Sequence, residues 1–297
     1  MVKENASNLT LIIQGPFNDQ ISENAQIYRK EFPLLEILII SWEEDYYKYK
    51  QQFPENSEKI KVITAKDPGG DISSCNEKFN VNRQLVSTKK GLQLSNTEYC
   101  LKTRSDFTLN LNLTIKKFNK FNRSNDTNTE FNESILILNL TSENPLYSNR
   151  YFAFCDWLYL GLTDDLKKLI ISDQYPKIFL KHKIENNSSL RYNAEQWMVL
   201  KGLLGQNFLG IIPNSYAINE SIINSYMKVL RSFIILNPRL IGLNSHKYHF
   251  LQFKLSNMYT YKEWKSMYYE SYNYSFDIER ILYNIHGFLF KIKKIIS

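Results

Sequence analysis

Four short apolar runs in the first 106 residues each end in side chains that could bind a ligand. The polar endings are Gln14-Gly15-Pro16, Ser41-Trp42-Glu43, Asp67-Pro68-Gly69-Gly70 and Arg104-Ser105-Asp106. A carboxylate such as Asp106 is a ligand for divalent cations, and the planar guanidinium of Arg104 can donate to two phosphate oxygens at once. These residue types suit a ligand that carries phosphate.

The chain around these endings alternates predicted strands with predicted helices. The apolar runs predict strands at Leu9–Gln14, Leu35–Ser41, Lys61–Ala65 and Tyr99–Thr103, and helical patterns occupy Ile21–Phe32 and Asn80–Ser95. This alternation is typical of βαβ units and a mostly parallel sheet, in which the carboxyl ends of the strands form one ligand crevice. We therefore expect the four polar endings to converge.

A polar, Asn-rich stretch at Phe118–Asn132 predicts a surface loop between two halves of the chain, at about 1–117 and about 133–258. The later half contains predicted strands at Ile135–Leu140, Phe208–Ile212 and Phe233–Leu236. It also contains predicted helices at Asp164–Ile171, capped by Thr163, and at Ala194–Leu204. Residues 259–297 are predicted to form a helical tail.

Length and composition exclude several classes of protein. A chain of 297 residues with 43% hydrophobic and 23% charged residues can bury a full core, which excludes disorder. Its apolar runs are far shorter than the roughly 20 residues of a transmembrane helix, and the polar start Met1–Asn8 predicts a cytoplasmic protein. Cys75, Cys100 and Cys155 are odd in number and far apart, so free thiols are expected. The formal charge of +7 favours anionic partners.

Five segments, taken in order, carry a resemblance to a known family. They are Leu11-Ile12-Ile13-Gln14-Gly15-Pro16, Ile40-Ser41-Trp42-Glu43, Lys66-Asp67-Pro68-Gly69-Gly70, Asn82-Arg83-Gln84-Leu85-Val86-Ser87-Thr88 and Leu101-Lys102-Thr103-Arg104-Ser105-Asp106. Looser agreement continues through Cys155-Asp156-Trp157 with Gly161-Leu162, and Ala194-Glu195-Gln196. In these segments the chain resembles the WavE family of lipopolysaccharide synthesis proteins.

This resemblance implies a glycosyltransferase of the GT-A type, which transfers a sugar from a nucleotide-sugar donor to lipopolysaccharide or capsule. The implied fold is α/β, a mostly parallel Rossmann-type sheet flanked by helices, with a C-terminal helical extension. The implied donor-binding residues are Gln14, Gly15, Pro16, Ser41, Trp42, Asp67, Asn82, Arg83, Arg104, Ser105 and Asp106.

The resemblance also implies that Asp106 holds Mg²⁺ or Mn²⁺ on the donor diphosphate. The chain departs from the GT-A pattern because Arg104 and Ser105 stand where other acidic residues would be, so Arg104 could neutralise phosphate itself. His246 and His249 are candidates for a late metal ligand, although lone histidines are more often structural.

Three later residues are implied to serve the acceptor and the chemistry. Trp157 would stack on a sugar ring, and Glu195 or Asp156 would deprotonate the acceptor hydroxyl if the enzyme inverts. Gln196 stands at the second position of an expected acidic pair, and a neutral amide cannot act as a base. The structural alternatives are a core tryptophan for Trp157 and, for Glu195, a favourable acidic residue in the first helical turn.

Structural alternatives also exist for the donor-binding residues. The Asp106 segment could be a solvated strand end, Arg83 could form a surface salt bridge, and the Gln14 and Asp67 segments could be plain turns. A sugar nucleotidyltransferase would need a Gly-rich basic loop after the first strand, which the sequence following Gln14 lacks. A basic nucleic-acid-binding protein is the non-enzymatic alternative, but the lysines are dispersed and no such motif is present.

The tail has the pattern of an amphipathic basic helix. Ile281, Leu282, Ile285, Phe288, Leu289 and Ile292 recur at helical spacing beside Arg280, Lys291, Lys293 and Lys294. Such a helix either lies on the inner face of the cytoplasmic membrane or packs against the catalytic domain. A membrane location would suit a lipid-linked acceptor.

Overall fold

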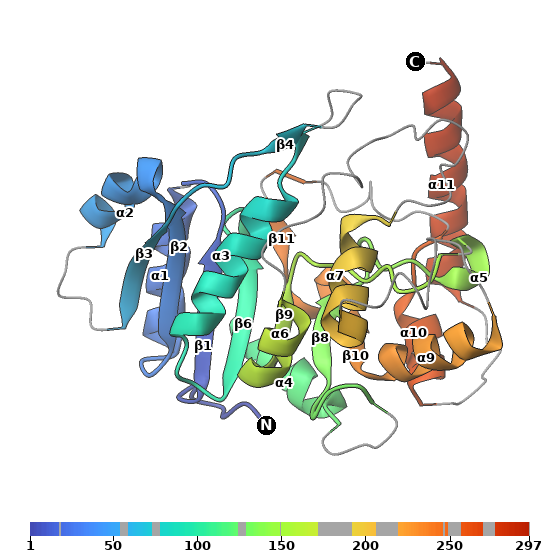
Figure 1. Cartoon of the computed structure of the whole chain (residues 1–297), viewed down its shortest axis with the longest axis horizontal. Coiled ribbons are helices and arrows are strands. Elements are labelled where there is room, and N and C mark those ends of the chain that lie inside the picture. The colour runs from blue at the N-terminus through green and yellow to red at the C-terminus, as the bar shows by residue number, and fades with distance from the viewer. Residues whose placement is uncertain are drawn as a thin grey trace.

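The computed structural model describes residues 1–17, 19–53, 59–72, 78–123, 129–148, 150–171, 192–205, 219–245, 247–248, 257–269 and 277–296 (Figure 1). These residues build a seven-stranded sheet in the order β10-β8-β9-β6-β1-β2-β3. Its strands are β1 (Leu9–Gln14), β2 (Glu36–Trp42), β3 (Ile60–Ala65), β6 (Tyr99–Arg104), β8 (Ile135–Leu138), β9 (Tyr159–Leu162) and β10 (Phe233–Leu236).

The sheet is parallel except at β9, which runs antiparallel to both β6 and β8. Two short antiparallel pairs lie outside it, β4 (Asp71–Ile72) with β5 (Lys78–Phe79), and β7 (Phe107–Thr108) with β11 (Asn244–Ser245). The expected α/β class with a mostly parallel sheet is therefore confirmed.

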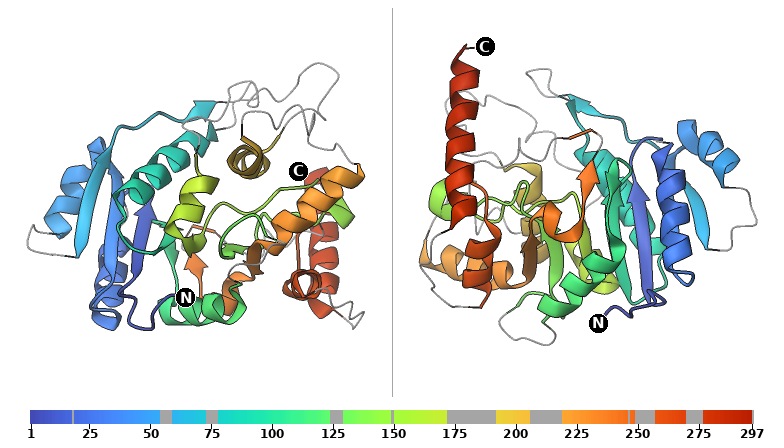
Figure 2. Two further views of the ribbon diagram at one scale, coloured as in Figure 1. Left: turned by 60° about the horizontal axis from the view of Figure 1, so that its bottom comes forward. Right: turned by 180° about the vertical axis from the view of Figure 1, so that it is seen from behind.

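Helices cover both faces of the sheet, as the two views in Figure 2 show. On one face lie α3 (Val81–Leu94), α6 (Thr163–Leu169) and α7 (Ala194–Leu204), and on the other lie α1 (Gln20–Glu31) and α4 (Leu111–Phe121). The other helices are α2 (Tyr46–Gln52), α5 (Pro145–Ser148), α9 (Glu220–Arg231), α10 (Tyr261–Tyr268) and α11 (Ile278–Ile296).

Most residues of the sheet are buried, because a mostly parallel sheet with helices on both faces has no solvent-facing side. Every residue of β1, β8 and β10 is buried. Gly91 lets α3 lie close to β1, since a Cβ atom there would stand only 2.5 Å from Cγ2 of Ile12. That contact fixes the helix that supplies one wall of the site described below.

Two details of the sequence prediction are wrong. The predicted loop at Phe118–Asn132 begins too early, because α4 extends to Phe121 and buries Phe118 against Tyr99 of β6 and Phe121 against Trp264 of α10. Thr163 is the first residue of α6 rather than its cap, and its hydroxyl instead donates to the Thr97 carbonyl at 2.7 Å. In both cases a contact with a distant part of the chain sets where the helix begins or ends, and the local sequence pattern does not contain that contact.

The later part of the chain holds two unpredicted α-helices, α5 and α9, and one untested strand. Helix α9 has buried residues at Ile222, Tyr226 and Val229, a spacing typical of an amphipathic helix. The predicted strand at Phe208–Ile212 lies outside the described residues. The helical tail is confirmed as α10 and α11, and α11 stands out from the body in Figure 1. None of the described helices combines the length and apolar character needed to span a membrane.

Candidate functional site

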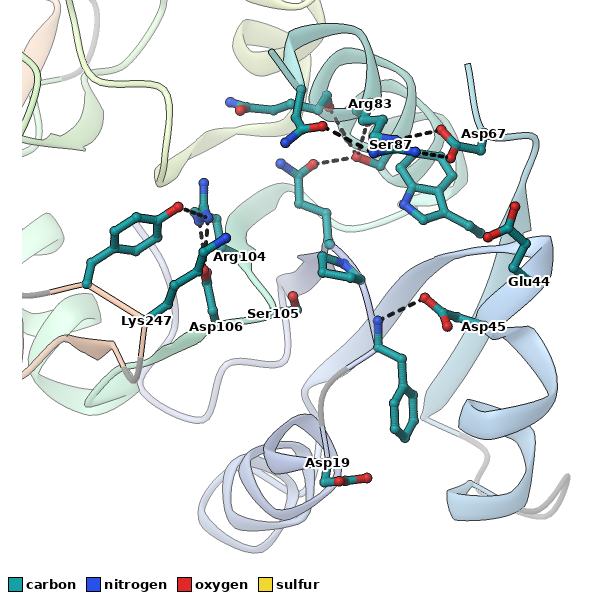
Figure 3. Close-up of a pocket in the computed structure, with 18 residues that line it drawn as sticks. Asp19, Glu44, Asp45, Asp67, Arg83, Ser87, Arg104, Ser105, Asp106 and Lys247 are labelled. Carbon is teal, nitrogen blue, oxygen red and sulfur yellow. Dashed lines mark hydrogen bonds and ion pairs between the residues drawn. The ribbon is translucent and has the colours of Figure 1, made fainter. Parts of the chain in front are cut away.

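The four polar strand endings meet in one pocket of about 700 Å³ (Figure 3). That volume is in the usual range for small-molecule sites. The residues predicted from the sequence that line it are Gln14, Gly15, Pro16, Trp42, Asp67, Arg83, Arg104, Ser105 and Asp106. They follow β1, β2, β3 and β6 or begin α3, so the predicted convergence at the carboxyl edge is confirmed.

Two predicted residues lie outside the pocket lining. Ser41 is fully buried within β2, and its hydroxyl donates to the Trp42 carbonyl at 3.1 Å. Asn82 is buried on α3, one residue before Arg83. Their sequence positions next to lining residues made them candidates, but side-chain direction along a strand or helix separates such neighbours.

Gln14 is held at the centre of the site by α3. Its amide oxygen accepts hydrogen bonds from the Ser87 hydroxyl at 2.9 Å and the Thr88 hydroxyl at 2.6 Å. Because the oxygen is engaged in this way, the amide nitrogen is the group that remains to donate to a ligand. Gly15 has a φ of +134°, and a Cβ atom there would stand 2.3 Å from Oγ of Ser105, so the close approach of β1 to β6 requires glycine.

One wall of the pocket carries a bidentate ion pair between Arg83 and Asp67. Nε of Arg83 lies 2.8 Å from Oδ1 of Asp67, and Nη2 lies 2.5 Å from Oδ2. These hydrogen bonds lower the pKa of Asp67, which also accepts from the Gly69 backbone at 2.9 Å. Arg83 therefore does form a salt bridge, as the structural alternative proposed, but it does so on the wall of the pocket.

The opposite wall carries a second bidentate pair, between Arg104 and Asp106 (Figure 3). Nε and Nη2 of Arg104 donate to the two carboxylate oxygens of Asp106, both at 2.9 Å. Three aromatic rings surround the guanidinium, with ring centres 4.9 Å away for Trp157, 5.2 Å for Tyr248 and 5.4 Å for Phe107. Arg104 is thus fixed in a plane, which favours oriented recognition of an anion.

Asp106, the predicted metal ligand, is occupied by Arg104 in this structure. Arg104 engages both oxygens of Asp106, and no group of three or more His, Cys, Asp or Glu residues among the described residues could hold an ion. His246 and His249 lie outside the described residues. The cationic groups that line the pocket are Arg83, Arg104 and Lys247.

Asp156 and Trp157 adjoin the pocket without lining it. The backbone carbonyl of Asp156 accepts hydrogen bonds from Nζ of Lys102 and, at 2.7 Å, from Nε2 of the pocket residue Gln84. Trp157 is half-buried, and its ring centre lies 5.0 Å from that of the pocket residue Tyr248. It packs against the hydrophobic core and also lies over the guanidinium of Arg104.

Glu195 stands in the first turn of α7, where its charge interacts with that of Asp156 although 39 residues separate them. Burial, and then the Asp156 charge, raise the pKa of Glu195 to about 8. Burial also raises the pKa of Asp156, while Lys102 and Arg104 oppose the rise. The charges of the two candidate bases therefore interact, although Asp156 is buried and Glu195 is half-buried.

Gln196 has a structural function that explains why it is not acidic. Asn193 and Gln196 form a capping box at the start of α7, with the Asn193 side chain accepting from the Gln196 backbone at 2.7 Å. The Gln196 amide also donates to the Tyr151 carbonyl at 2.7 Å. A carboxylate could accept the capping bond but could not donate to Tyr151.

Lys102 is a charged residue of the site that the sequence analysis missed. It lies in the middle of β6, is fully buried, and its Nζ stands 5.3 Å from the centre of the Tyr159 ring. Burial lowers the pKa of Lys102 to about 8. A lysine inside a buried parallel strand was the available signal, since such positions are almost always apolar.

The fold and site define an α/β protein with a charged ligand pocket at the carboxyl edge of a mostly parallel sheet. The WavE lipopolysaccharide synthesis family matches residues 9–296, so the chain belongs to that family. No curated protein sequence matches the chain.

Several solved structures are similar to this chain at low identity. A glycosyltransferase involved in glycosylation of the major capsid of PBCV-1 has a TM-score of 0.35 and 11% identity, over 82% of this chain and 97% of that one. An active-site mutant of LgtC has a TM-score of 0.38 and 8% identity, over 93% and 100%. The 4-diphosphocytidyl-2C-methyl-D-erythritol synthase from Anaerococcus prevotii has a TM-score of 0.34 and 11% identity, over 76% and 98%.

Proposed function

We propose that the protein is a glycosyltransferase that moves a sugar from a nucleotide-sugar donor to a growing bacterial surface glycan, either lipopolysaccharide or capsule. The observation that carries the proposal is a pocket with oriented guanidinium groups, close to the buried Asp156 and the half-buried Glu195, whose charges interact. Membership of a lipopolysaccharide synthesis family supports the same conclusion.

The donor would bind through its phosphates on the Arg104 side of the pocket. Phosphate oxygens can replace the Asp106 carboxylate as acceptors for the Arg104 fork, because the geometry of the two pairings is similar. The Gln14 amide and the rim at Trp42, Asp67 and Arg83 would then contact the ribose or base. Divalent metal dependence, which the family resemblance implies, stays a prediction, and no step of the proposal depends on it.

The acceptor hydroxyl would lose its proton to Glu195, with Asp156 as the alternative base. A carboxylate with a pKa of about 8 is well matched to proton abstraction near neutral pH. Trp157 would offer an aromatic face to a sugar ring of the acceptor. We propose a cytoplasmic location, which the buried free thiols of Cys100 and Cys155 support.

A thermal-shift screen of nucleotide sugars, with and without Mn²⁺, tests the proposal. One class of nucleotide sugar should raise the melting temperature. At a ligand concentration of a hundred times Kd, binding stabilises the folded protein by about 2.7 kcal/mol. The Arg104→Lys variant keeps the charge but loses the fork, so it should bind that donor at least tenfold more weakly. If no nucleotide sugar stabilises the protein, the proposal fails. Pyrophosphate release from a nucleoside triphosphate and a sugar phosphate would instead indicate a nucleotidyltransferase.

A further inference from the structure

The start of α11 is clamped to the body of the protein by Arg280. Its Nε donates to Oε1 of Glu263 at 2.6 Å, and its Nη2 donates to the Met258 carbonyl at 2.6 Å. The guanidinium also lies 4.1 Å from the centre of the Tyr147 ring. Because Arg280 is buried, these contacts fix the first turn of the helix to α10 and the chain before it.

A second set of contacts clamps the next turn. Oε1 of Glu279 accepts from Nδ2 of Asn237 at 2.6 Å and from the Tyr283 hydroxyl at 2.7 Å. Nδ2 of Asn139, just after β8, donates to that same Tyr283 hydroxyl at 2.9 Å. The Tyr283 side chain is 2% exposed. The direction of α11 relative to the sheet is therefore set by buried hydrogen bonds.

Beyond this clamp, the helix presents an uncovered apolar face. The α11 apolar face consists of Ile278, Ile281, Leu282, Ile285, Phe288 and Leu289, whose side chains are 41% to 64% exposed. At about 100° per residue they span an arc of roughly 120°, on the side away from Arg280 and Tyr283. The alternative that this stripe packs against the catalytic domain is therefore wrong, and a contiguous exposed patch of this kind marks a binding surface.

Charge selects what this face binds. Arg280 is engaged by Glu263, but after it the chain contains no acidic residue and has three lysines, Lys291, Lys293 and Lys294. An apolar face on a helix whose last turns contain lysines complements an anionic lipid surface, to which each lysine near the surface adds about 1 kcal/mol of attraction. A second copy of the helix would bring like charges together, which disfavours a dimer through the same face.

We propose that α11 is a membrane-surface arm, with its apolar face in the headgroup region of an anionic bilayer. Figures 1 and 2 show α11 extending past the sheet on the side where the parallel strands end. The clamp would thus fix how the body of the protein, and with it the pocket, is oriented at the lipid surface. If the protein is the proposed glycosyltransferase, its acceptor is then a glycan carried on a membrane lipid.

Vesicle sedimentation of the full chain tests this arm. The protein should sediment with phosphatidylglycerol–phosphatidylcholine vesicles and at least tenfold less with phosphatidylcholine alone. The variant Leu282→Ser/Ile285→Ser/Phe288→Ser should lose at least tenfold in vesicle binding without a change in melting temperature, since all three side chains are exposed. The matched control Ile27→Ser/Leu34→Ser removes equally exposed apolar side chains elsewhere and should bind as the parent does.

Three results would overturn the arm. They are equal sedimentation of parent and triple variant, equal binding to neutral and anionic vesicles, or a parent dimer in solution that the triple variant abolishes. Donor binding by thermal shift, measured on the same triple variant, keeps this inference separate from the proposed function. That binding should be unchanged, and its absence in the parent would count against the glycosyltransferase proposal alone.

Discussion

Glu195 and Asp156 show how two residues far apart in sequence become one chemical unit. Each is placed by a different element, Asp156 by the segment before β9 and Glu195 by the first turn of α7. Burial raises the pKa of both, and Lys102 and Arg104 favour the charged form of Asp156. We therefore propose Glu195 rather than Asp156 as the base, because its raised pKa of about 8 lies close to neutral pH.

A pH profile with matched variants tests that assignment. If Glu195 is the base, kcat/KM should rise with pH through about 8, because the base must be deprotonated and its pKa is raised to about 8. Glu195→Gln should lower kcat by about 10²- to 10⁴-fold and remove that limb of the profile. Near-normal turnover in Glu195→Gln together with an inactive Asp156→Asn would assign the base to Asp156 instead.

At the scale of elements, local patterns predicted most of what positions the site. The strand Phe233–Leu236 and the helix Ala194–Leu204 were predicted with the bounds observed, because each is a short apolar run between strong breakers or caps. The last turn of α4 was placed in the loop at Phe118–Asn132 because the Asn-rich sequence there obscured the apolar spacing that continues from Leu111 and Ile115 to Phe118.

The pairings within the site could not be predicted from sequence. Strand ends indicated that Arg104 and Asp67 would line the crevice, but Asp67 is paired by a residue from α3 and Arg104 is enclosed by Trp157 and Tyr248. Those partners come from 16 to 144 residues away. No local periodicity encodes which distant side chain reaches a strand end.

The contact between α3 and β1 yields a prediction at this scale. Gly91→Ala should destabilise the protein by about 1–3 kcal/mol, because the new Cβ atom would stand 2.5 Å from the Ile12 side chain. Displacing α3 should also weaken donor binding, since this helix supplies Arg83 and the hydroxyls that hold Gln14. Chemical denaturation and thermal shift measure the two effects. Gln93→Ala, exposed on the same helix, is the control, and equal stability of the two variants would contradict the packing argument.

At the scale of the whole molecule, the sheet edge that carries the pocket and the helix α11 extend toward the same side. The pocket lies where the parallel strands end, and α11 points the same way (Figure 1). The sequence indicated an amphipathic basic tail but left two partners open for it. Only the burial of Arg280 and Tyr283 and the exposure of the opposite side decide which side of the helix faces the protein.

A variant that breaks the Arg280 contacts can show whether α11 orients the protein on the membrane or only binds the membrane. Arg280→Leu removes the contacts to Glu263 and the Met258 carbonyl but leaves the α11 apolar face and the three lysines intact. Vesicle binding should therefore stay within about twofold of the parent, because affinity depends on buried apolar area and basic charge. Transfer to a vesicle-embedded acceptor should fall at least tenfold, since a misplacement of about 1 Å can cost on the order of a hundredfold in rate.

Transfer to a soluble acceptor analogue, measured below the variant's melting temperature, should be unchanged. An equal loss with both acceptors would mean that Arg280 supports only the fold, and equal activity with both would mean that the clamp does not orient the pocket.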